Sequence, residues 1–174
     1  SGCGKTTLLK LLLGQLKGYE GKILYDGKEL SLYDVDSFYE QMAYIEQSVF
    51  LFDTSIRDNI TLGDGVSAEK LEEILAMSAL KEEVKKFPDG LETRAGENGK
   101  NLSGGQKQRI AVARALVHDR QILFVDEGTS ALDAENAMVI EQALLACKEL
   151  TLILITHHMK EENLPLFDKV YRLG

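Results

Sequence analysis

Residues 1–14 read SGCGKTTLLKLLLG, and this stretch does most to decide the fold. A glycine-rich turn leads into a lysine, two threonines and leucines at positions 8, 9, 11, 12 and 13. Leucines this dense predict a helix over residues 6–15 that is buried on most sides, rather than a helix with one narrow apolar stripe. We therefore expect this helix to pack inside the domain, directly after the glycine turn.

The glycine turn matches the end of a phosphate-loop pattern, in which a glycine, four residues, a second glycine and a lysine precede serine or threonine. Gly4, Lys5 and Thr6 supply that end, and the first glycine would fall two places before Ser1, so we expect the given chain to begin inside the motif. In such a loop backbone N–H groups and the helix dipole favour phosphate oxygens, the lysine reaches the β- and γ-phosphates, and the hydroxyl ligates Mg²⁺. By themselves, the same residues could form a glycine turn that only caps a helix.

Three short apolar runs that end abruptly in polar residues predict buried parallel strands. They are QMAYIEQ at 41–47, RQILFVDE at 120–127 and LTLILITHH at 150–158, and KVYRLG at 169–174 predicts a late strand. Asp26 and Gly27 lie between two short extended runs and predict a hairpin.

Helical patterns separate these strands. Ser67 is a plausible N-cap for a helix that continues until Pro88, a second helix follows LSGG as far as about His118, and a third covers residues 134–147. Strands that alternate with helices indicate a doubly wound α/β core with a helical insert.

Composition restricts the class of protein. The 174 residues, 44% of them hydrophobic, suit one domain, and no apolar run approaches the ~20 residues that span a bilayer, so we expect a soluble domain. Lysine and arginine are scattered and the net charge is -8, which argues against nucleic acid as a partner. Cys3 and Cys147 indicate a reduced intracellular protein rather than a disulfide framework.

The polar residues that end the predicted strands are candidates for chemistry, because ligands gather at the carboxyl ends of strands in α/β sheets. They are Gln47, then Asp126 with Glu127, then His157 with His158. One carboxylate could hold Mg²⁺ while its neighbour orients or deprotonates a water molecule. Ordinary solvation of a strand end is the alternative interpretation of the acidic pair.

The stretch NLSGGQKQR at 101–109 predicts a second helix N-terminus that suits an anion. A flexible loop with an N-cap is the simpler alternative. A nucleotide that Lys5 already holds does not need this second helix end, which suggests that it serves the nucleotide of another chain.

Taken together, these motifs strongly resemble the nucleotide-binding domain of an ABC transporter, and the resemblance covers essentially the whole chain. The motifs are, in order, SGCGKTT, IEQ, LSGGQKQR, ILFVDEGTSALD and ITHH. LFDTSIRDNITLG at 51–63 and AGENGKNLSGGQ at 95–106 resemble the exporter branch.

The resemblance implies a P-loop NTPase fold of the α/β class, with a mostly parallel sheet flanked by helices and a helical signature subdomain. It implies one partial ABC ATPase domain over residues 1–174. Residues 1–47 would form core with the Walker A motif and Q-loop, 48–118 the helical subdomain, and 119–174 core with the Walker B motif, D-loop and H-loop.

The resemblance also implies ATP and Mg²⁺ as cofactors and assigns roles to individual residues. Glu127 would be the general base, Gln47 would sense metal and attacking water, and His157, preferred to His158 because it directly follows IT, would contact the γ-phosphate. The remaining assignments are ATP binding by Ser1, Gly2, Cys3, Gly4, Lys5, Thr6 and Thr7; metal binding by Thr6, Gln47 and Asp126; a signature of Ser103, Gly104, Gly105 and Gln106 over the partner's γ-phosphate; and a D-loop Asp133 that joins the two sites.

The function implied is an ATPase that powers export, in a head-to-tail dimer of nucleotide-binding domains under transmembrane domains at the cytoplasmic face of a membrane. An importer subunit, a soluble ABC-type ATPase that works on DNA or ribosomes, and a regulatory module that binds ATP without turnover are the alternatives. Gly128 stands where the family usually has proline, which we expect to loosen the turn after Glu127. We expect the full-length parent to hydrolyse ATP and the given fragment to bind it poorly.

Overall fold

A parallel three-stranded sheet forms the centre of the computed structural model, which describes residues 4–129, 131–156 and 161–172. Strand β4, Ile122–Asp126, lies between β3, Met42–Ile45, and β5, Thr151–Ile155, and both neighbours run parallel to it. The three predicted strands and their direction are confirmed. The central strand is the most buried, whereas β5 is half-buried and exposed at its start.

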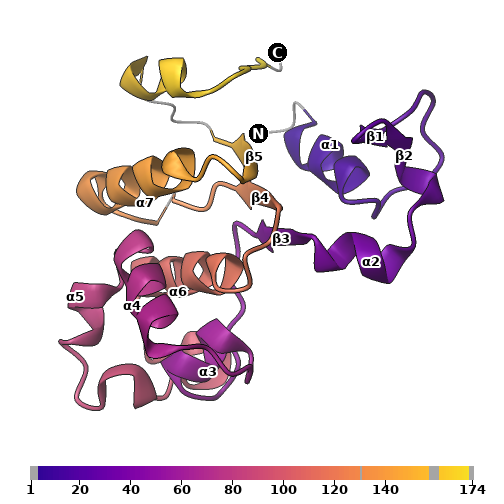
Figure 1. The fold of residues 1–174 in the computed structure, drawn as a ribbon. Coiled ribbons are helices and arrows are strands. Elements are labelled where there is room, and N and C mark those ends of the chain that lie inside the picture. The colour runs from indigo at the N-terminus through magenta and orange to yellow at the C-terminus, as the bar shows by residue number, and fades with distance from the viewer. Residues whose placement is uncertain (1–3, 130, 157–160, 173–174) are drawn as a thin grey trace.

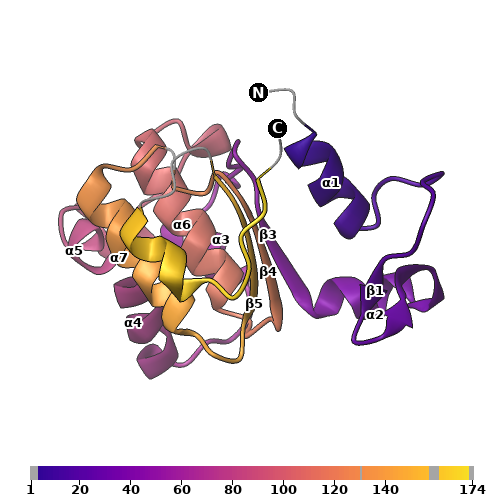
Figure 2. The same ribbon diagram turned by 90° about the horizontal axis from the view of Figure 1, so that it is seen from above.

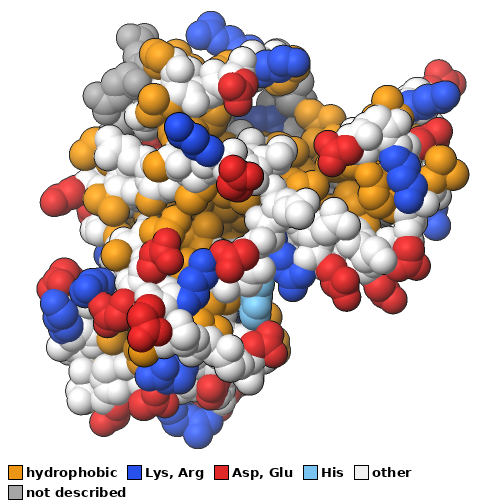
Figure 3. Space-filling view, in the orientation of Figure 1, with side chains coloured by type: hydrophobic (Ala, Val, Ile, Leu, Met, Phe, Trp, Pro, Cys, Tyr) orange, Lys and Arg blue, Asp and Glu red, His pale blue; other side chains and the backbone are white. Residues whose placement is uncertain are grey.

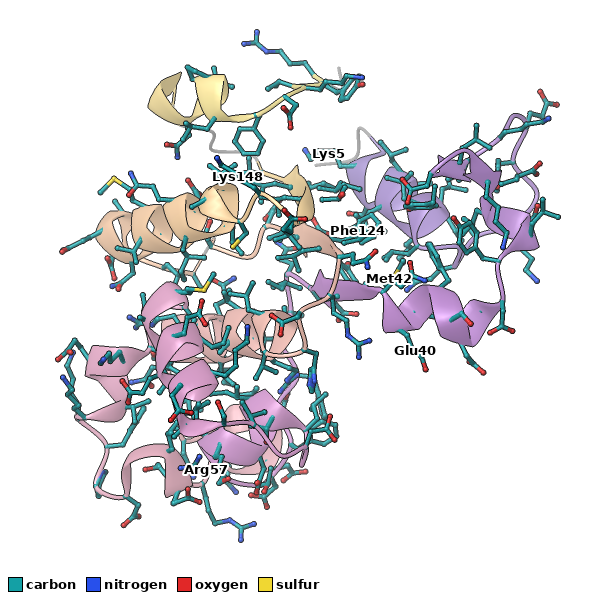
Figure 4. All side chains as sticks on the ribbon, viewed as in Figure 1. Lys5, Glu40, Met42, Arg57, Phe124 and Lys148 are labelled. Carbon is teal, nitrogen blue, oxygen red and sulfur yellow. The ribbon has the colours of Figure 1, made fainter. Side chains whose placement is uncertain are left out.

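Helices cover both faces of this sheet, as Figure 2 shows with α1 on one side and α6 and α7 on the other. Side chains alternate across the pleat of β4, so that Leu123 and Val125 join the larger core under α6 and α7. Phe124 joins a smaller core with Leu9 of α1 and Met42 of β3, and Figure 4 shows Phe124 and Met42 on that side. The doubly wound arrangement is confirmed.

Helix α1, Lys5–Leu12, is buried on one face only. Leu9 and Leu13 are buried against the sheet, but Leu8 is 44% exposed and both threonines are exposed. The expectation of a helix buried on most sides is therefore wrong for this structure, because among the described residues the sheet and the β1–β2 segment cover only one side of it. Gly14, at φ 71, ends the helix region earlier than residue 15.

The predicted hairpin is confirmed. Strands β1, Leu24–Tyr25, and β2, Lys28–Glu29, pair antiparallel around Asp26 and Gly27. Both turn residues have positive φ, 49° and 77°, as a tight type I′ connection requires. The 3₁₀ turn η1, Leu30–Leu32, and helix α2, Val35–Glu40, follow and lead into β3.

The helical insert lies between β3 and β4 and forms the lower part of the molecule in Figure 1. The Ser67 side chain accepts a hydrogen bond from Lys70 N, which confirms the predicted N-cap. The helix does not continue to Pro88, because the chain turns at Ala79, where φ is 53°, and buries Leu80 completely. The elements of the insert are α3, Ile56–Thr61; α4, Ala68–Met77; α5, Lys81–Val84; η2, Gly90–Glu92; η3, Glu97–Gly99; and α6, Gly104–Leu116.

The chain ends with helix α7, Ala134–Ala146, strand β5 and the 3₁₀ segment η4, Glu161–Leu166. Helix α7 matches the predicted helix to within one residue. Residues 169–172 are irregular, so the late strand predicted there is wrong for the residues that the structure describes. Within the described ranges, no helix is both long enough and apolar enough to cross a bilayer.

Candidate active site

Two of the predicted catalytic residues meet at the carboxyl edge of the sheet. Gln47 follows β3 and Glu127 follows β4, and the Gln47 Nε2 donates a 2.8 Å hydrogen bond to Glu127 Oε2. Asp126, the last residue of β4, is only 6% exposed and directly precedes Glu127. The edge therefore carries one buried carboxylate and one carboxylate that an amide orients.

The backbone at Glu127 is held in an unusual conformation. Its φ is 52°, in the left-handed region, which costs a residue with a side chain about 1–3 kcal/mol and persists only where the surroundings hold it. Its N–H donates to the Ile155 carbonyl at 3.0 Å, which ties the turn after β4 to the end of β5. Strain that is held in place at a strand end is a frequent property of functional sites.

Gln108 of helix α6 is hydrogen-bonded to the same turn. It is not among the site residues predicted from the sequence. Its side chain is buried, its Nε2 donates to the Glu127 carbonyl at 3.3 Å, and its Oε1 accepts from Ala131 N at 2.9 Å. Gln108 lies two residues after the last residue of LSGGQ, and because its burial cannot be read from the sequence, no local pattern marked it as functional. Its amide connects the helix after LSGGQ to the loop after Glu127.

Gly128, which we expect to loosen this loop, lies where a larger side chain has no room. A Cβ at this position would lie 2.6 Å from Val125 Cγ1 and 3.1 Å from Ile45 Cγ2. Real Cβ atoms do not approach side chains this closely, so the backbone packs directly onto both strands. The glycine permits a close approach rather than added freedom.

The phosphate-loop residues lie at the same edge of the molecule. Figure 2 shows that α1 begins at the side where β3, β4 and β5 end. Gly4 is the N-cap of α1 with φ 86°, Lys5 is half-exposed, and Thr6 and Thr7 are exposed. The remaining assignments of this loop, Ser1, Gly2 and Cys3, and the choice of His157 over His158 lie outside the described residues.

The signature turn is built by a reciprocal capping box. Ser103 Oγ accepts from Gln106 N at 3.2 Å, and Gln106 Oε1 accepts from Ser103 N at 2.8 Å. Gln106 Nε2 also donates to Glu83 Oε2 at 3.0 Å. The Gln106 amide is thus bonded within its own chain, whereas the Ser103 hydroxyl still has a proton to donate.

The two glycines of the signature let helix α6 pack closely on the loop that leads to α7. A Cβ on Gly105 would lie 3.3 Å from the Ala131 carbonyl oxygen, and one on Gly104 would lie 3.5 Å from Ala131 Cβ. At the end of this loop Asp133 caps α7, accepting from Asn136 N at 3.0 Å. Hydrogen bonds from the Asn136 backbone and side chain hold the pKa of Asp133 below its usual range.

Acidic and basic side chains are mixed on the face of the molecule seen in Figure 3. A groove of mixed polarity runs beside the Q-loop, lined by residues of β3, the following loop and α6. Phe50 and Phe52 stack edge to face beside it, with ring centroids 5.2 Å apart, and both are more than half exposed.

Known proteins resemble this chain over most of its length. The sequence pattern of the family described as ABC transporter matches residues 1–130. The chain is 41% identical over 145 residues to the heterocyst differentiation ATP-binding protein HepA of Nostoc sp., covering 83% of this chain and 24% of that protein. It is 42% identical over 161 residues to multidrug resistance protein pgp-1 of Caenorhabditis elegans, covering 91% and 12%.

A third relative is the ATP-dependent lipid A-core flippase of Burkholderia orbicola, 41% identical over 160 residues, with 91% of this chain and 27% of that protein covered. Among solved structures, that of a bacterial Atm1-family ABC exporter with ATP bound is 35% identical and superposes with a TM-score of 0.82 over 87% of this chain and 27% of that chain. The chain thus spans about a quarter or less of the length of these relatives. With a family match over three quarters of its length and the P-loop NTPase fold, the chain belongs to the ABC transporter family.

Proposed function

We propose that this chain binds and hydrolyses ATP and that its full-length protein uses this energy to export a substrate across a membrane. The hydrogen bond between Gln47 and Glu127 carries the proposal, because it connects a strand-end carboxylate to the residue that the Q-loop supplies. The names of the relatives, a flippase and a multidrug resistance protein among them, favour export over import.

The oxygen ligands at the sheet edge suit Mg²⁺. Asp126 offers a buried carboxylate, Thr6 an exposed hydroxyl and Gln47 an amide oxygen, and hard oxygen donors of this kind are those that Mg²⁺ prefers. Bound there with the ATP phosphates, Mg²⁺ would neutralise charge on the γ-phosphate. Because the Gln47 amide nitrogen points at Glu127, its oxygen is turned away from that carboxylate and is available to a hydrated cation.

Glu127 is the general base in this proposal. Its carboxylate accepts a proton from the water that attacks the γ-phosphate, and the Gln47 amide holds the carboxylate in place. The strained turn at Glu127 is fixed by the Ile155 carbonyl and by Gln108, so the base does not need to be ordered during the reaction. Lys5, Thr6 and Thr7 bind the phosphates, and His157 contacts the γ-phosphate.

The signature residues serve the ATP of a second nucleotide-binding domain. Ser103 and the N-terminus of α6 suit an anion, whereas Gln47 and Glu127 lie at the sheet edge that also carries this chain's own phosphate loop. A head-to-tail dimer satisfies both sets, with Asp133 between the sites, and the transmembrane domains of the exporter place this dimer at the cytoplasmic face. The groove beside Phe50 is the surface where those domains would dock.

The test is coupled ATP hydrolysis and transport by the full-length gene product that contains this sequence. Reconstituted in lipid vesicles, it should hydrolyse ATP only with Mg²⁺ and should move a fluorescent lipid or a hydrophobic dye with ATP present. Lys5→Ala should abolish both hydrolysis and transport. Lys28→Ala should abolish neither, because Lys28 is an exposed hairpin residue whose Nζ lies over the Tyr33 ring. ATP-driven movement of the lipid or dye toward the side of the membrane on which this domain lies would contradict export.

A further inference from the structure

A carboxylate of helix α5 accepts a hydrogen bond from the signature turn. Glu83 is 14% exposed, and its Oε2 accepts a 3.0 Å hydrogen bond from Gln106 Nε2. Its Oε1 accepts from Lys86 Nζ at 2.5 Å, and an Arg109 nitrogen lies 3.7 Å from Oε2. Two cations and one amide therefore surround this carboxylate. The amide of Gln106 and the guanidinium of Arg109 both come from α6.

The Gln106 amide connects Glu83 to Ser103. A carboxylate can only accept, so Glu83 requires the Gln106 nitrogen to face it and leaves the amide oxygen for the Ser103 N–H, at 2.8 Å. The capping box closes with Ser103 Oγ on Gln106 N. Without Glu83, the amide could rotate and withdraw its oxygen from Ser103.

Glu83 remains an acceptor at neutral pH. The hydrogen bond from Lys86, followed by that from Gln106, holds the pKa of Glu83 below its usual range. Lys86 and Arg109 also offset its negative charge, which would otherwise oppose an anion at the start of α6. The cluster can therefore order the turn without repelling phosphate.

We infer that Glu83 is a positioning residue for the ATP bound by the partner subunit, acting through Gln106 to fix Ser103 and the first N–H groups of α6. This inference rests on the proposed shared site. Loss of Glu83 should damage the site that uses this chain's signature and should spare the site that uses this chain's phosphate loop.

The matched control lies on the same helix. Glu82 precedes Glu83, is exposed, and pairs with Lys85 at 2.6 Å three residues on, as Glu83 does with Lys86. Within the part of the chain that the structure describes, no hydrogen bond or ion pair joins it to the signature turn. Glu82→Ala thus removes the same type of charge and the same type of ion pair from α5 without touching Gln106.

The test compares two heterodimers that contain the same two substitutions, Lys5→Ala and Glu83→Ala, either in different subunits or in the same subunit. Full-length gene products with different affinity tags are coexpressed, heterodimers are isolated over both tags, and all chains carry Glu127→Gln so that bound ATP is retained. In the split arrangement one subunit carries Lys5→Ala and the other Glu83→Ala, which leaves one undisturbed site. In the joined arrangement one subunit carries both, and the only site with an intact phosphate loop then uses the altered signature.

We expect radiolabelled ATP to leave the joined heterodimer about 10-fold faster than the split one, as loss of a charge-assisted hydrogen bond predicts. Glu83→Gln, which keeps the shape and an acceptor, should give a smaller difference of the same sign. With Glu82→Ala the two arrangements should release ATP equally. A purely structural role of Glu83 would affect both arrangements alike, so equal release with Glu83→Ala and with Glu83→Gln would overturn the inference.

A further pair of heterodimers, with Ser103→Arg in place of Glu83→Ala, separates this inference from the proposed function. If the split arrangement retains ATP and the joined one does not, sites are shared, and an absent Glu83 effect then counts against Glu83 alone. If Ser103→Arg gives no difference, or if no heterodimers form, the shared site itself is wrong and the inference fails with it.

Discussion

The side chains of Gln47 and Glu127 are joined by a 2.8 Å hydrogen bond although 80 residues separate them in the chain. The parallel pairing of β3 with β4 brings them together, because Ile45 lies opposite Val125 and both strands end at the same edge. The bond aligns a carboxylate whose backbone is already fixed by β5 and by α6.

Removing the amide of Gln47 should slow hydrolysis without weakening ATP binding. Gln47→Ala leaves the Glu127 carboxylate without its orienting donor, so we expect kcat of the full-length gene product to fall about 10-fold or more with little change in ATP affinity. Gln41→Ala is the control, because Gln41 lies at the other end of β3 and its side chain bonds to the Ser37 carbonyl. Steady-state ATPase rates and nucleotide titrations measure both; an unchanged kcat in Gln47→Ala would count against the role of this pair.

Gln108→Met should also lower kcat, through the backbone rather than through the reacting groups. Methionine fills the buried space but neither donates to the Glu127 carbonyl nor accepts from Ala131 N. We expect kcat to fall about 5- to 10-fold, as loss of two buried hydrogen bonds predicts. In a Glu127→Gln background the same substitution should add little, since its effect passes through the base.

Leu116→Ala is the stability control for Gln108, because it removes a buried side chain at the opposite end of α6. It should lower the melting temperature while leaving kcat nearly unchanged. If both variants reduced kcat in proportion to their loss of stability, Gln108 would have only a structural role.

Gly128 should resist every larger side chain, including the proline that is usual in the family. Gly128→Ala places a Cβ 2.6 Å from Val125 Cγ1, and such overpacking costs about 1–3 kcal/mol of the free energy of unfolding. Gly65→Ala, with open space around its Cβ, should change stability by only about 0.5 kcal/mol. Thermal or urea unfolding distinguishes them, and an unaffected Gly128→Ala protein would show that this packing is not rigid.

Much of the sheet could be predicted from local patterns. The three strands are apolar runs that stop at Glu46, Asp126 and Thr156, and the caps at Ser67 and Asp133 are short polar side chains at helix starts. The short helices α2 and α3 were not predicted, since six residues give too little periodicity. The turn at Ala79 carries no glycine or proline and follows from the burial of Leu80.

Some residues of the candidate site could likewise be predicted from the sequence, and others could not. Glu127 and Gln47 could be proposed because each ends a strand, but their contact depends on the strand order, which the sequence does not state. Gln108 and Glu83 act through contacts with residues far along the chain, 19 residues away for Gln108 and 23 for Glu83. The close packing of Val125 on Gly128 could not be predicted, because it depends on the backbone conformation of the turn after β4.

The most direct test of the account is single-turnover hydrolysis of MgATP by the full-length gene product with Glu127→Gln. Glutamine keeps the side-chain shape but cannot accept the proton of the attacking water. We expect hydrolysis about 100-fold slower or more, ATP affinity near that of the wild type, and no loss with Glu40→Gln, which points away from the site on α2 in Figure 4. A Glu127→Gln protein that hydrolyses ATP at nearly the wild-type rate would contradict the assignment of the base and, with it, the proposed mechanism.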